Sequence, residues 1–297
     1  MNFLRSITSL LQDPPPALAF ELSEAGIAVA TTGQPPTLDF RAFAPGVISV
    51  SPLRDNILQP DEFARAARAI VPLNGTRKRR GAALILPDNC ARVSVLDFDS
   101  FPPDAREQSA LVRFRMKKSV PYDVESAAVS YWPQPAGGGS KKVEVVVTLA
   151  PLEIVARYEA PFRAAGIDPG FVTTSAIAAL ELVREEGIVV VAKLSGLVLT
   201  VLVVDKGRLK LVRSLELTAA STEEIAADLY PTFVFVEDNL SAKVDKLLLC
   251  GFGRLHEEAR GEFERELGVP VEPVRSPLGP PAENNAGLLG YLQSLAA

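Results

Sequence analysis

The side chains that most often carry out chemistry in enzymes are scarce in this sequence. His256 is the only histidine, and Cys90 and Cys250 are the only cysteines. A Ser-His-Asp triad would have to use His256, and the G-x-S-x-G turn that presents the nucleophile of many hydrolases is absent. The zinc patterns H-E-x-x-H and C-x-x-C are absent too. We therefore expect no metal site, no catalytic residue of these classes and a reducing compartment.

Composition narrows the class of protein further. The chain has 297 residues, which is enough for two domains or two lobes, and 47% of them are hydrophobic, as in a globular protein with a large core. The formal net charge of −5 argues against a general nucleic-acid binder. The most apolar run, residues 188–204, is shorter than the roughly 20 residues of a membrane-spanning helix. Lys193, Ser195 and Gly196 interrupt this run, so we expect two buried strands in a cytoplasmic protein.

Two stretches of the chain carry the same order of predicted elements. Residues 17–43 and 188–217 each alternate like three strands joined by tight turns. An amphipathic helix, a buried strand and further helices follow each of them. Such a duplication predicts an α/β protein with two related lobes, as in the actin and Hsp70 (ribonuclease H-like) architecture.

We expect three divisions of the chain. Residues 1–16 combine a short helix that has one apolar face with a triple proline. This helix either packs on the body or on a partner, or touches a membrane surface weakly. Residues 17–187 form the first lobe, with a small inserted subdomain at about 88–133 that contains a helix over 104–120. The first lobe closes with a helix over 174–187. Residues 188–297 form a shortened second lobe.

A strand that contains an arginine is followed, within residues 86–132, by a helix with a basic end and a Val-Pro-aromatic step. The residues are Arg92, Lys117, Lys118, Val120, Pro121 and Tyr122. This pattern resembles the PilM family of type IV pilus assembly proteins, and residues 143–183 continue the resemblance. Residues 250–274 are similar to the strand, helix and strand of the family's adenosine site. The resemblance covers nearly the whole chain and implies a divergent relative in the actin-like ATPase superfamily.

The resemblance also reveals departures at the two hairpins that grip phosphates in actin-like ATPases. Each of those hairpins carries an aspartate near the metal and a turn of small residues whose N–H groups contact phosphate. In the first hairpin here, Glu21 replaces the aspartate and Glu24 follows Ser23 in the turn. In the second hairpin Lys193 replaces the aspartate, and the turn keeps a serine and a glycine, Ser195 and Gly196.

A third departure is the short segment 218–245, which leaves room for one or two helices where the family generally has a subdomain that closes over the nucleotide. Gly251 and Gly253 resemble the nucleotide-binding set, although a tight turn between strand and helix has the same pattern. The residual nucleotide-binding residues would be Glu21, Ser23, Lys193, Ser195, Gly196, Gly251 and Gly253. We expect no cofactor and no ATPase activity. The alternative is an ATPase or switch that keeps ATP and magnesium, with Lys193 contacting phosphate.

The resemblance implies a partner. PilM proteins recruit the cytoplasmic tail of the bitopic inner-membrane protein PilN into a groove beside the small subdomain, which would hold an extended peptide by backbone hydrogen bonds and apolar pockets. The candidate groove residues are Val93, Val95, Phe98, Phe114, Val120, Pro121 and Tyr122. Three of these, Val95, Phe98 and Phe114, are equally typical of ordinary core.

The end of the subdomain helix is strongly basic. Arg113, Arg115, Lys117 and Lys118 would meet acidic lipid headgroups, meet a partner's carboxylates, or form a solvated helix face. The expected location is therefore the cytoplasm, peripheral to the inner membrane. A further alternative is a secretion-system component of the same fold with a different partner.

Overall fold

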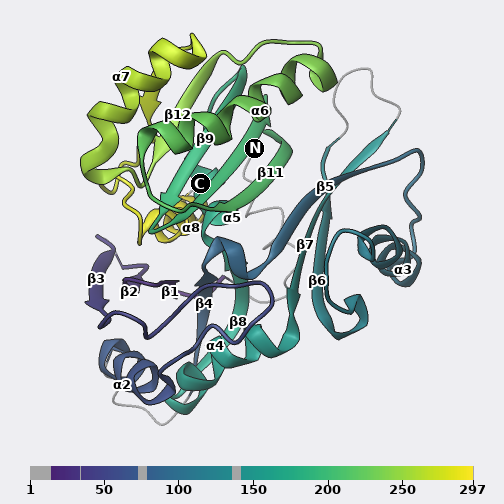
Figure 1. The fold of residues 1–297 in the computed structure, drawn as a ribbon. Helices are drawn as coiled ribbons and strands as arrows, with labels where there is room; N and C mark the ends of the chain where they lie inside the picture. Colours follow the sequence, from purple (N-terminus) through teal and green to yellow (C-terminus); the bar gives the residue numbers. More distant parts are fainter. Residues whose placement is uncertain (1–14, 34, 73–78, 136–141, 297) are drawn as a thin grey trace.

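A computed structural model describes residues 15–33, 35–72, 79–135 and 142–296 (Figure 1). The expected N-terminal amphipathic segment therefore lies almost entirely outside the described residues. Two five-stranded sheets and one three-stranded sheet organise the chain. No helix within the described ranges is both long and apolar enough to cross a bilayer.

The first lobe is built on a sheet with the order β3-β2-β1-β4-β8. Its strands are β1 (Leu18–Ser23), β2 (Gly26–Thr31), β3 (Thr37–Ala42), β4 (Arg80–Leu86) and β8 (Ile167–Thr174). The first three strands are antiparallel, and β4 and β8 join in parallel. Helices α2 (Pro60–Ile70) and α4 (Leu152–Ala164) cover one face with a core that contains Phe20, Phe63 and Phe162.

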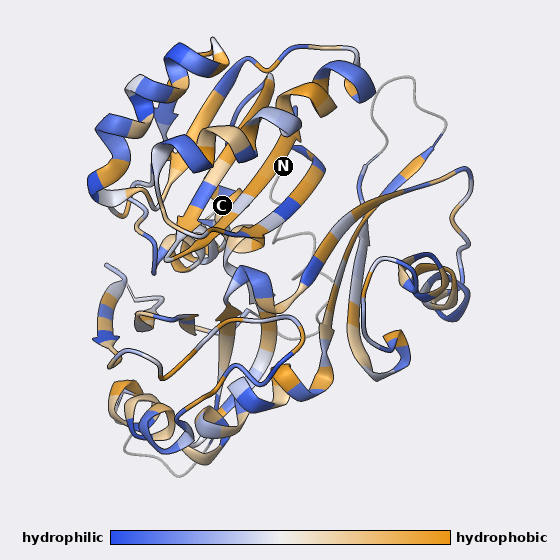
Figure 2. Cartoon of the chain, in the orientation of Figure 1, coloured by the Kyte–Doolittle hydropathy of each residue, from blue (hydrophilic) through white to orange (hydrophobic). Residues whose placement is uncertain are grey.

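The second lobe repeats this plan with the order β11-β10-β9-β12-β13. Its strands are β9 (Ile188–Ser195), β10 (Val198–Asp205), β11 (Arg208–Glu216), β12 (Lys246–Cys250) and β13 (Val271–Pro273). Helices α6 (Thr222–Leu240) and α7 (His256–Leu267) cover its outer face, and the strands beneath them are strongly hydrophobic (Figure 2). The expected duplication of a ribonuclease H-like lobe is confirmed.

The two sheets share a core in which helices α5 (Ser175–Ala179) and α8 (Ala286–Ala296) pack together. A side chain at Gly290 would collide with the carbonyl oxygen of Ala178, so the glycine permits this close contact. Helix α8 comes from the part of the chain expected in the second lobe, yet it contacts α5 and β1 of the first. The helix expected over 174–187 is shorter than predicted, because α5 passes into one 3-10 turn at 180–182 and then an extended segment.

The small subdomain is a three-stranded antiparallel sheet with the order β5-β7-β6. Its strands are β5 (Arg92–Phe98), β6 (Ala127–Pro133) and β7 (Val143–Pro151), and helix α3 (Ala105–Met116) covers one face. Because β7 is the central strand, this sheet extends beyond the expected range that ended at 133. The helix expected over 104–120 ends at Met116, and Lys117 to Tyr122 form turns.

The subdomain is also fastened to the second lobe. Glu144 on β7 forms ion pairs with Arg208 at 2.6 Å and Lys210 at 2.7 Å, both on β11. The side-chain amide of Gln134 donates to the carbonyl oxygen of Leu209 and accepts from its N–H, each at 2.8 Å. These contacts hold the subdomain in a fixed position beside β11.

Candidate functional site

The two hairpins that align with phosphate-binding hairpins hold equivalent positions in the two sheets. Strands β1 and β2 pair as far as the turn Ser23–Gly26, and β9 and β10 pair as far as the turn Ser195–Val198. Glu21 and Lys193 each lie two residues before their turn. The structure thus places two side chains of opposite charge at matching positions of the duplicated fold.

Glu21 is buried and faces the start of α8 rather than an open cleft. Its carboxylate accepts hydrogen bonds from the hydroxyl of Ser175 and from the N–H groups of Gly287 at 3.2 Å and Leu288 at 2.7 Å. The first turn of a helix has free N–H donors, which a carboxylate satisfies. Burial raises the pKa of Glu21, and the positive charge of Lys193 and these hydrogen bonds counteract only part of that effect.

Lys193 is also buried, and it crosses from the second lobe to the first. Its ammonium donates to Asp88 Oδ2 at 2.9 Å, and both side chains are at least 96% buried. The Thr200 hydroxyl donates to the same oxygen at 3.1 Å, and the Ala176 N–H donates to Asp88 Oδ1 at 2.6 Å. Although burial lowers the pKa of Lys193, the carboxylates of Asp88 and Glu21 outweigh it and raise that pKa, so the ammonium stays charged.

We call Glu21, Asp88, Lys193 and Thr200 the interlobe charge cluster. Asp88 follows β4 of the first lobe, whereas Lys193 and Thr200 are on β9 and β10 of the second. Breaking the contact between Asp88 and Lys193 would leave charges without partners in a buried place, which is costly. The cluster therefore holds the two lobes in one relative orientation.

The raised pKa of Glu21 gives a testable pH dependence. A carboxyl whose pKa is higher in the folded protein than in the unfolded chain holds its proton more tightly when folded. Its contribution to the free energy of unfolding is therefore full below about pH 4.5 and is lost as the pH rises toward the folded pKa. We expect Glu21→Gln to remove this loss, so the variant gains stability relative to the natural protein as the pH rises above about 4.5. Urea unfolding at several pH values measures it, with the exposed Glu257→Gln as the matched control. A difference between Glu21→Gln and the natural protein that does not change with pH would contradict it.

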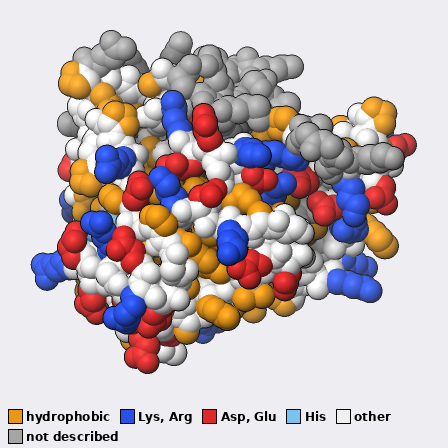
Figure 3. Space-filling model, turned by 90° about the horizontal axis from the view of Figure 1, so that it is seen from above, with side chains coloured by type: hydrophobic (Ala, Val, Ile, Leu, Met, Phe, Trp, Pro, Cys, Tyr) orange, Lys and Arg blue, Asp and Glu red, His pale blue; other side chains and the backbone are white. Residues whose placement is uncertain are grey.

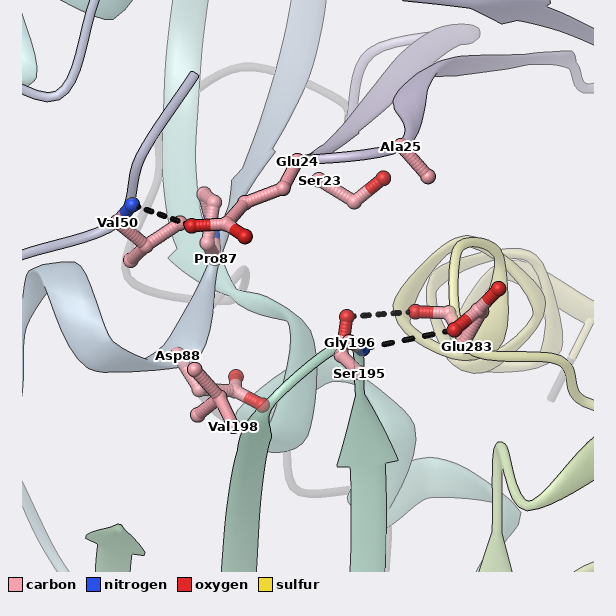
Figure 4. Close-up of a pocket in the computed structure, with 10 residues that line it drawn as sticks. All are labelled: Ser23, Glu24, Ala25, Val50, Pro87, Asp88, Ser195, Gly196, Val198 and Glu283. Atoms are coloured by element: carbon pink, nitrogen blue, oxygen red, sulfur yellow. Dashed lines mark hydrogen bonds between the residues drawn. The ribbon is translucent and has the colours of Figure 1, made fainter. Parts of the chain in front are cut away.

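A carboxylate also lies at each of the two hairpin turns (Figure 4). Glu24 in the first turn accepts from the N–H of Val50 at 2.7 Å. At the second turn, the hydroxyl of Ser195 donates to the carbonyl oxygen of Glu283 at 2.9 Å, and the N–H of Gly196 lies 3.5 Å from the Glu283 carboxylate. A carboxylate thus lies beside the backbone N–H that would contact a phosphate in an actin-like ATPase.

The space left between the turns is small and acidic. This cleft pocket has a volume of about 50 Å³. Its polar lining includes Ser23, Glu24, Asp88, Ser195, Gly196 and Glu283. Pockets for drug-sized ligands usually measure about 300–1,000 Å³, and neighbouring carboxylates repel a triphosphate. The described residues contain no group of three or more His, Cys, Asp or Glu side chains placed to hold a metal ion. The residues present do not fit magnesium and ATP.

The remaining residues of the expected nucleotide set lie close by. Gly251 has φ +79°, and a side chain there would collide with the carbonyl oxygen of Leu194 and press on the backbone of Glu283. This glycine therefore lets the loop that carries Glu283 approach the end of β9. Gly253 begins a 3-10 turn before α7, with open space at the position of its missing side chain.

The seven candidate groove residues separate into different places. Four of them, Val93, Val120, Pro121 and Tyr122, line one pocket of about 140 Å³. Pro52, Asn89, Ala91, Arg92, Ser119, Val212 and Ser214 complete its lining. We call it the junction pocket, because it lies where the subdomain, the first lobe and β11 of the second lobe meet.

The other three candidates do not line the junction pocket. Successive side chains of a strand point to opposite faces, so Val95 packs toward the core between the lobes while Phe98 packs under α3. Phe98 is thus ordinary core of the subdomain. Phe114 projects from α3, and its residue is 74% exposed.

Two residues of the site were missed by the sequence reasoning. Asp88 follows the carboxyl end of a buried strand, where sites of α/β sheets usually form, so its position was a usable signal. Glu283 lies in a proline-rich loop whose path no local pattern predicts. Both reach the cleft pocket only because distant segments meet there.

Comparisons with known proteins define the class. No family model and no curated protein matches the sequence. A protein of Bacteroides thetaiotaomicron described as having an actin-like ATPase fold and unknown function matches with a TM-score of 0.55 at 14% identity, covering 97% of this chain and 98% of that chain. With its two duplicated sheets, the chain has the actin-like ATPase fold.

Within that fold the chain is similar to PilM, as solved in a PilM–PilN type IV pilus biogenesis complex. The match has a TM-score of 0.75 at 18% identity and covers 95% of this chain and 97% of that chain. The resemblance to PilM predicted from the sequence is confirmed at the level of the fold. The cytoplasmic domain of EpsL, an inner-membrane component of the type II secretion system of Vibrio cholerae, matches with a TM-score of 0.48 at 14% identity, covering 78% of this chain and 80% of that domain.

Proposed function

We propose that this chain is a PilM-like scaffold of a type IV pilus, or related secretion, assembly platform at the cytoplasmic face of the inner membrane. In this role it binds the cytoplasmic tail of a bitopic PilN-like membrane protein. The observation that carries the proposal is the junction pocket, in a fold similar over 95% of the chain to a protein solved in complex with PilN.

The junction pocket has the chemistry that an extended peptide needs. Val93, Val120 and Val212 give it apolar walls, and the hydroxyl of Tyr122 donates to the Leu149 carbonyl oxygen at 3.3 Å, which orients the ring. Strand β5 lies at the edge of the small sheet, paired only with β7 among the strands described. A tail residue with an aliphatic side chain would fill the pocket while the neighbouring backbone runs along β5.

The scaffold would work without nucleotide. The interlobe charge cluster fixes the lobes, and Glu24 and Glu283 take the places beside the turns. Phosphoryl transfer needs cations and N–H donors that stabilise negative charge on the transferred group. In this protein the lysine of the second hairpin, Lys193, is already bonded to Asp88.

Peptide binding tests the proposal directly. Synthetic N-terminal tails of bitopic inner-membrane proteins encoded beside this chain are titrated into the full-length protein by calorimetry. Saturable one-to-one binding of one tail, and not of its scrambled sequence, is the expected result. If every tail fails to bind while the protein remains folded, the proposed partner is wrong.

Magnesium and ATP test the nucleotide part separately. We expect millimolar Mg-ATP to leave the melting temperature unchanged, whereas a bound tail raises it. A ligand present at a hundred times its Kd would stabilise the folded state by about 2.7 kcal/mol, which thermal unfolding detects easily. A rise in melting temperature with Mg-ATP would favour the ATP-dependent switch instead.

A further inference from the structure

Helix α3 presents an aromatic side chain to solvent. Phe114 is the most exposed large hydrophobic residue of the described chain, at 74%. Its neighbours Val112 and Met116 point inward and are fully buried in the subdomain core. Packing within the protein therefore accounts for these neighbours but leaves the outward position of Phe114 unexplained.

The surroundings of Phe114 are basic. Arg113, Arg115, Lys117 and Lys118 flank it, and residues 108–122 contain no acidic side chain. None of these four cations forms an ion pair with any residue that the structure describes. The clustering is notable in a protein whose net charge is −5.

Part of this charge has a structural role. The guanidinium of Arg113 donates to the carbonyl oxygens of Val124 and Ala127, and Arg115 lies 5.1 Å from the ring centre of Phe98. Cations at the end of a helix also complement its dipole. Lys117 and Lys118, however, are exposed just after the last residue of α3, and their ammonium groups donate no hydrogen bond to any residue that the structure describes.

An extended binding surface fits these features better than a partner that inserts into a narrow pocket. Phe114, Arg106 and Lys117 border a shallow, open trough of about 590 Å³ on α3, and Glu125 is the carboxylate on its lining. The subdomain projects at one side of the molecule, where basic and acidic side chains both reach the surface (Figures 1 and 3). Anionic headgroups attract clustered Lys and Arg, and the interfacial region accepts a protruding aromatic ring without a preformed pocket.

We propose that the outer face of α3 binds the surface of an anionic membrane. Phe114 enters the interfacial region, while Arg106, Lys117 and Lys118 contact lipid phosphates. The proposal deepens the proposed function, on which it rests for its biological setting, because a protein that holds the tail of a membrane partner works within reach of the bilayer. The contact is weak by itself, and tail docking would add to it through a high effective concentration.

Sedimentation of the full-length protein with vesicles tests this inference. We expect binding to vesicles of phosphatidylcholine with phosphatidylglycerol, little binding to phosphatidylcholine alone, and loss of binding at high salt. Phe114→Ser and the double variant Lys117→Glu/Lys118→Glu should each bind at least roughly tenfold more weakly. Tyr230→Ser is the matched control, since Tyr230 is 63% exposed on α6, away from this face.

The outcomes separate this inference from the proposed function. If the α3 variants bind anionic vesicles as well as the natural protein does, the membrane surface is not recognised by α3. If the natural protein does not bind anionic vesicles, the inference is wrong. If the α3 variants then also fail to bind a purified acidic protein that the natural protein binds, the face is a protein-docking surface. Tail-peptide binding is measured on every variant, and its absence alongside intact vesicle binding would overturn the proposed function only.

Discussion

Lys193→Met should destabilise the folded protein by about 3–5 kcal/mol, the usual cost of removing one partner from a buried ion pair. The reason is that Asp88 would remain buried and would have lost its only ion-pair partner among the described residues, while Glu21 would lose a nearby positive charge. Most domains are stable by about 5–15 kcal/mol, so this loss is a large share of the total. Urea unfolding followed by circular dichroism measures it.

Two further variants identify the cause. In Asp88→Asn/Lys193→Met both charges are removed, and replacement of a buried pair by neutral groups is often close to neutral in stability, so much of the loss should be recovered. Lys246→Met is the matched control, because Lys246 pairs with Glu272 at 3.1 Å in a partly exposed position where ion pairs contribute about 0–1 kcal/mol. Equal stability of Lys193→Met and the natural protein would show that the interlobe charge cluster does not hold the lobes.

Filling the junction pocket should abolish tail binding. Ser119→Trp places a large ring at an exposed position on the pocket wall, and Pro121→Asp places a charge beside apolar walls. Loss of a central interface contact costs about 2–4 kcal/mol, so we expect roughly 30- to 1,000-fold weaker binding of the tail peptide. Calorimetric titration of each variant measures the change.

The matched control for this prediction lies on the same subdomain. Phe114→Ser alters the exposed face of α3, outside the junction pocket, and should bind the tail peptide with unchanged affinity. Both pocket positions are exposed, so their melting temperatures should stay near that of the natural protein. Undiminished binding by Ser119→Trp would place the tail elsewhere on the molecule.

Much of the fold could be predicted because its signals are local. Residues 17–43 and 188–217 alternate with the period of strands, and glycines mark the turns that join them. Helix ends were harder to predict. The helix expected over 104–120 stops at Met116, although no proline occurs until Pro121, and the residues that follow form turns that line the junction pocket.

The candidate site was predictable only in part. The hairpin pattern revealed that Glu21 and Lys193 stand where aspartates are expected. Their bonding partners could not be predicted, because these lie far away in the chain: Asp88 lies 105 residues before Lys193, and Leu288 lies 267 residues after Glu21. Such contacts depend on how the lobes and α8 come together. Phe114 shows the same limit, since its spacing fitted both groove and core, and only the orientation of α3 excluded the core.

A short chain of hydrogen bonds links the junction pocket with the interlobe charge cluster. The hydroxyl of Ser214, which lines the junction pocket, lies 3.1 Å from that of Thr200, and Thr200 in turn donates to Asp88. In an ATPase, such a connection would let hydrolysis alter the affinity for a partner. In this protein Lys193 bonds to Asp88 at the inner end of the connection. Under the proposed function, the affinity for the tail should therefore not vary with the energy supply of the cell.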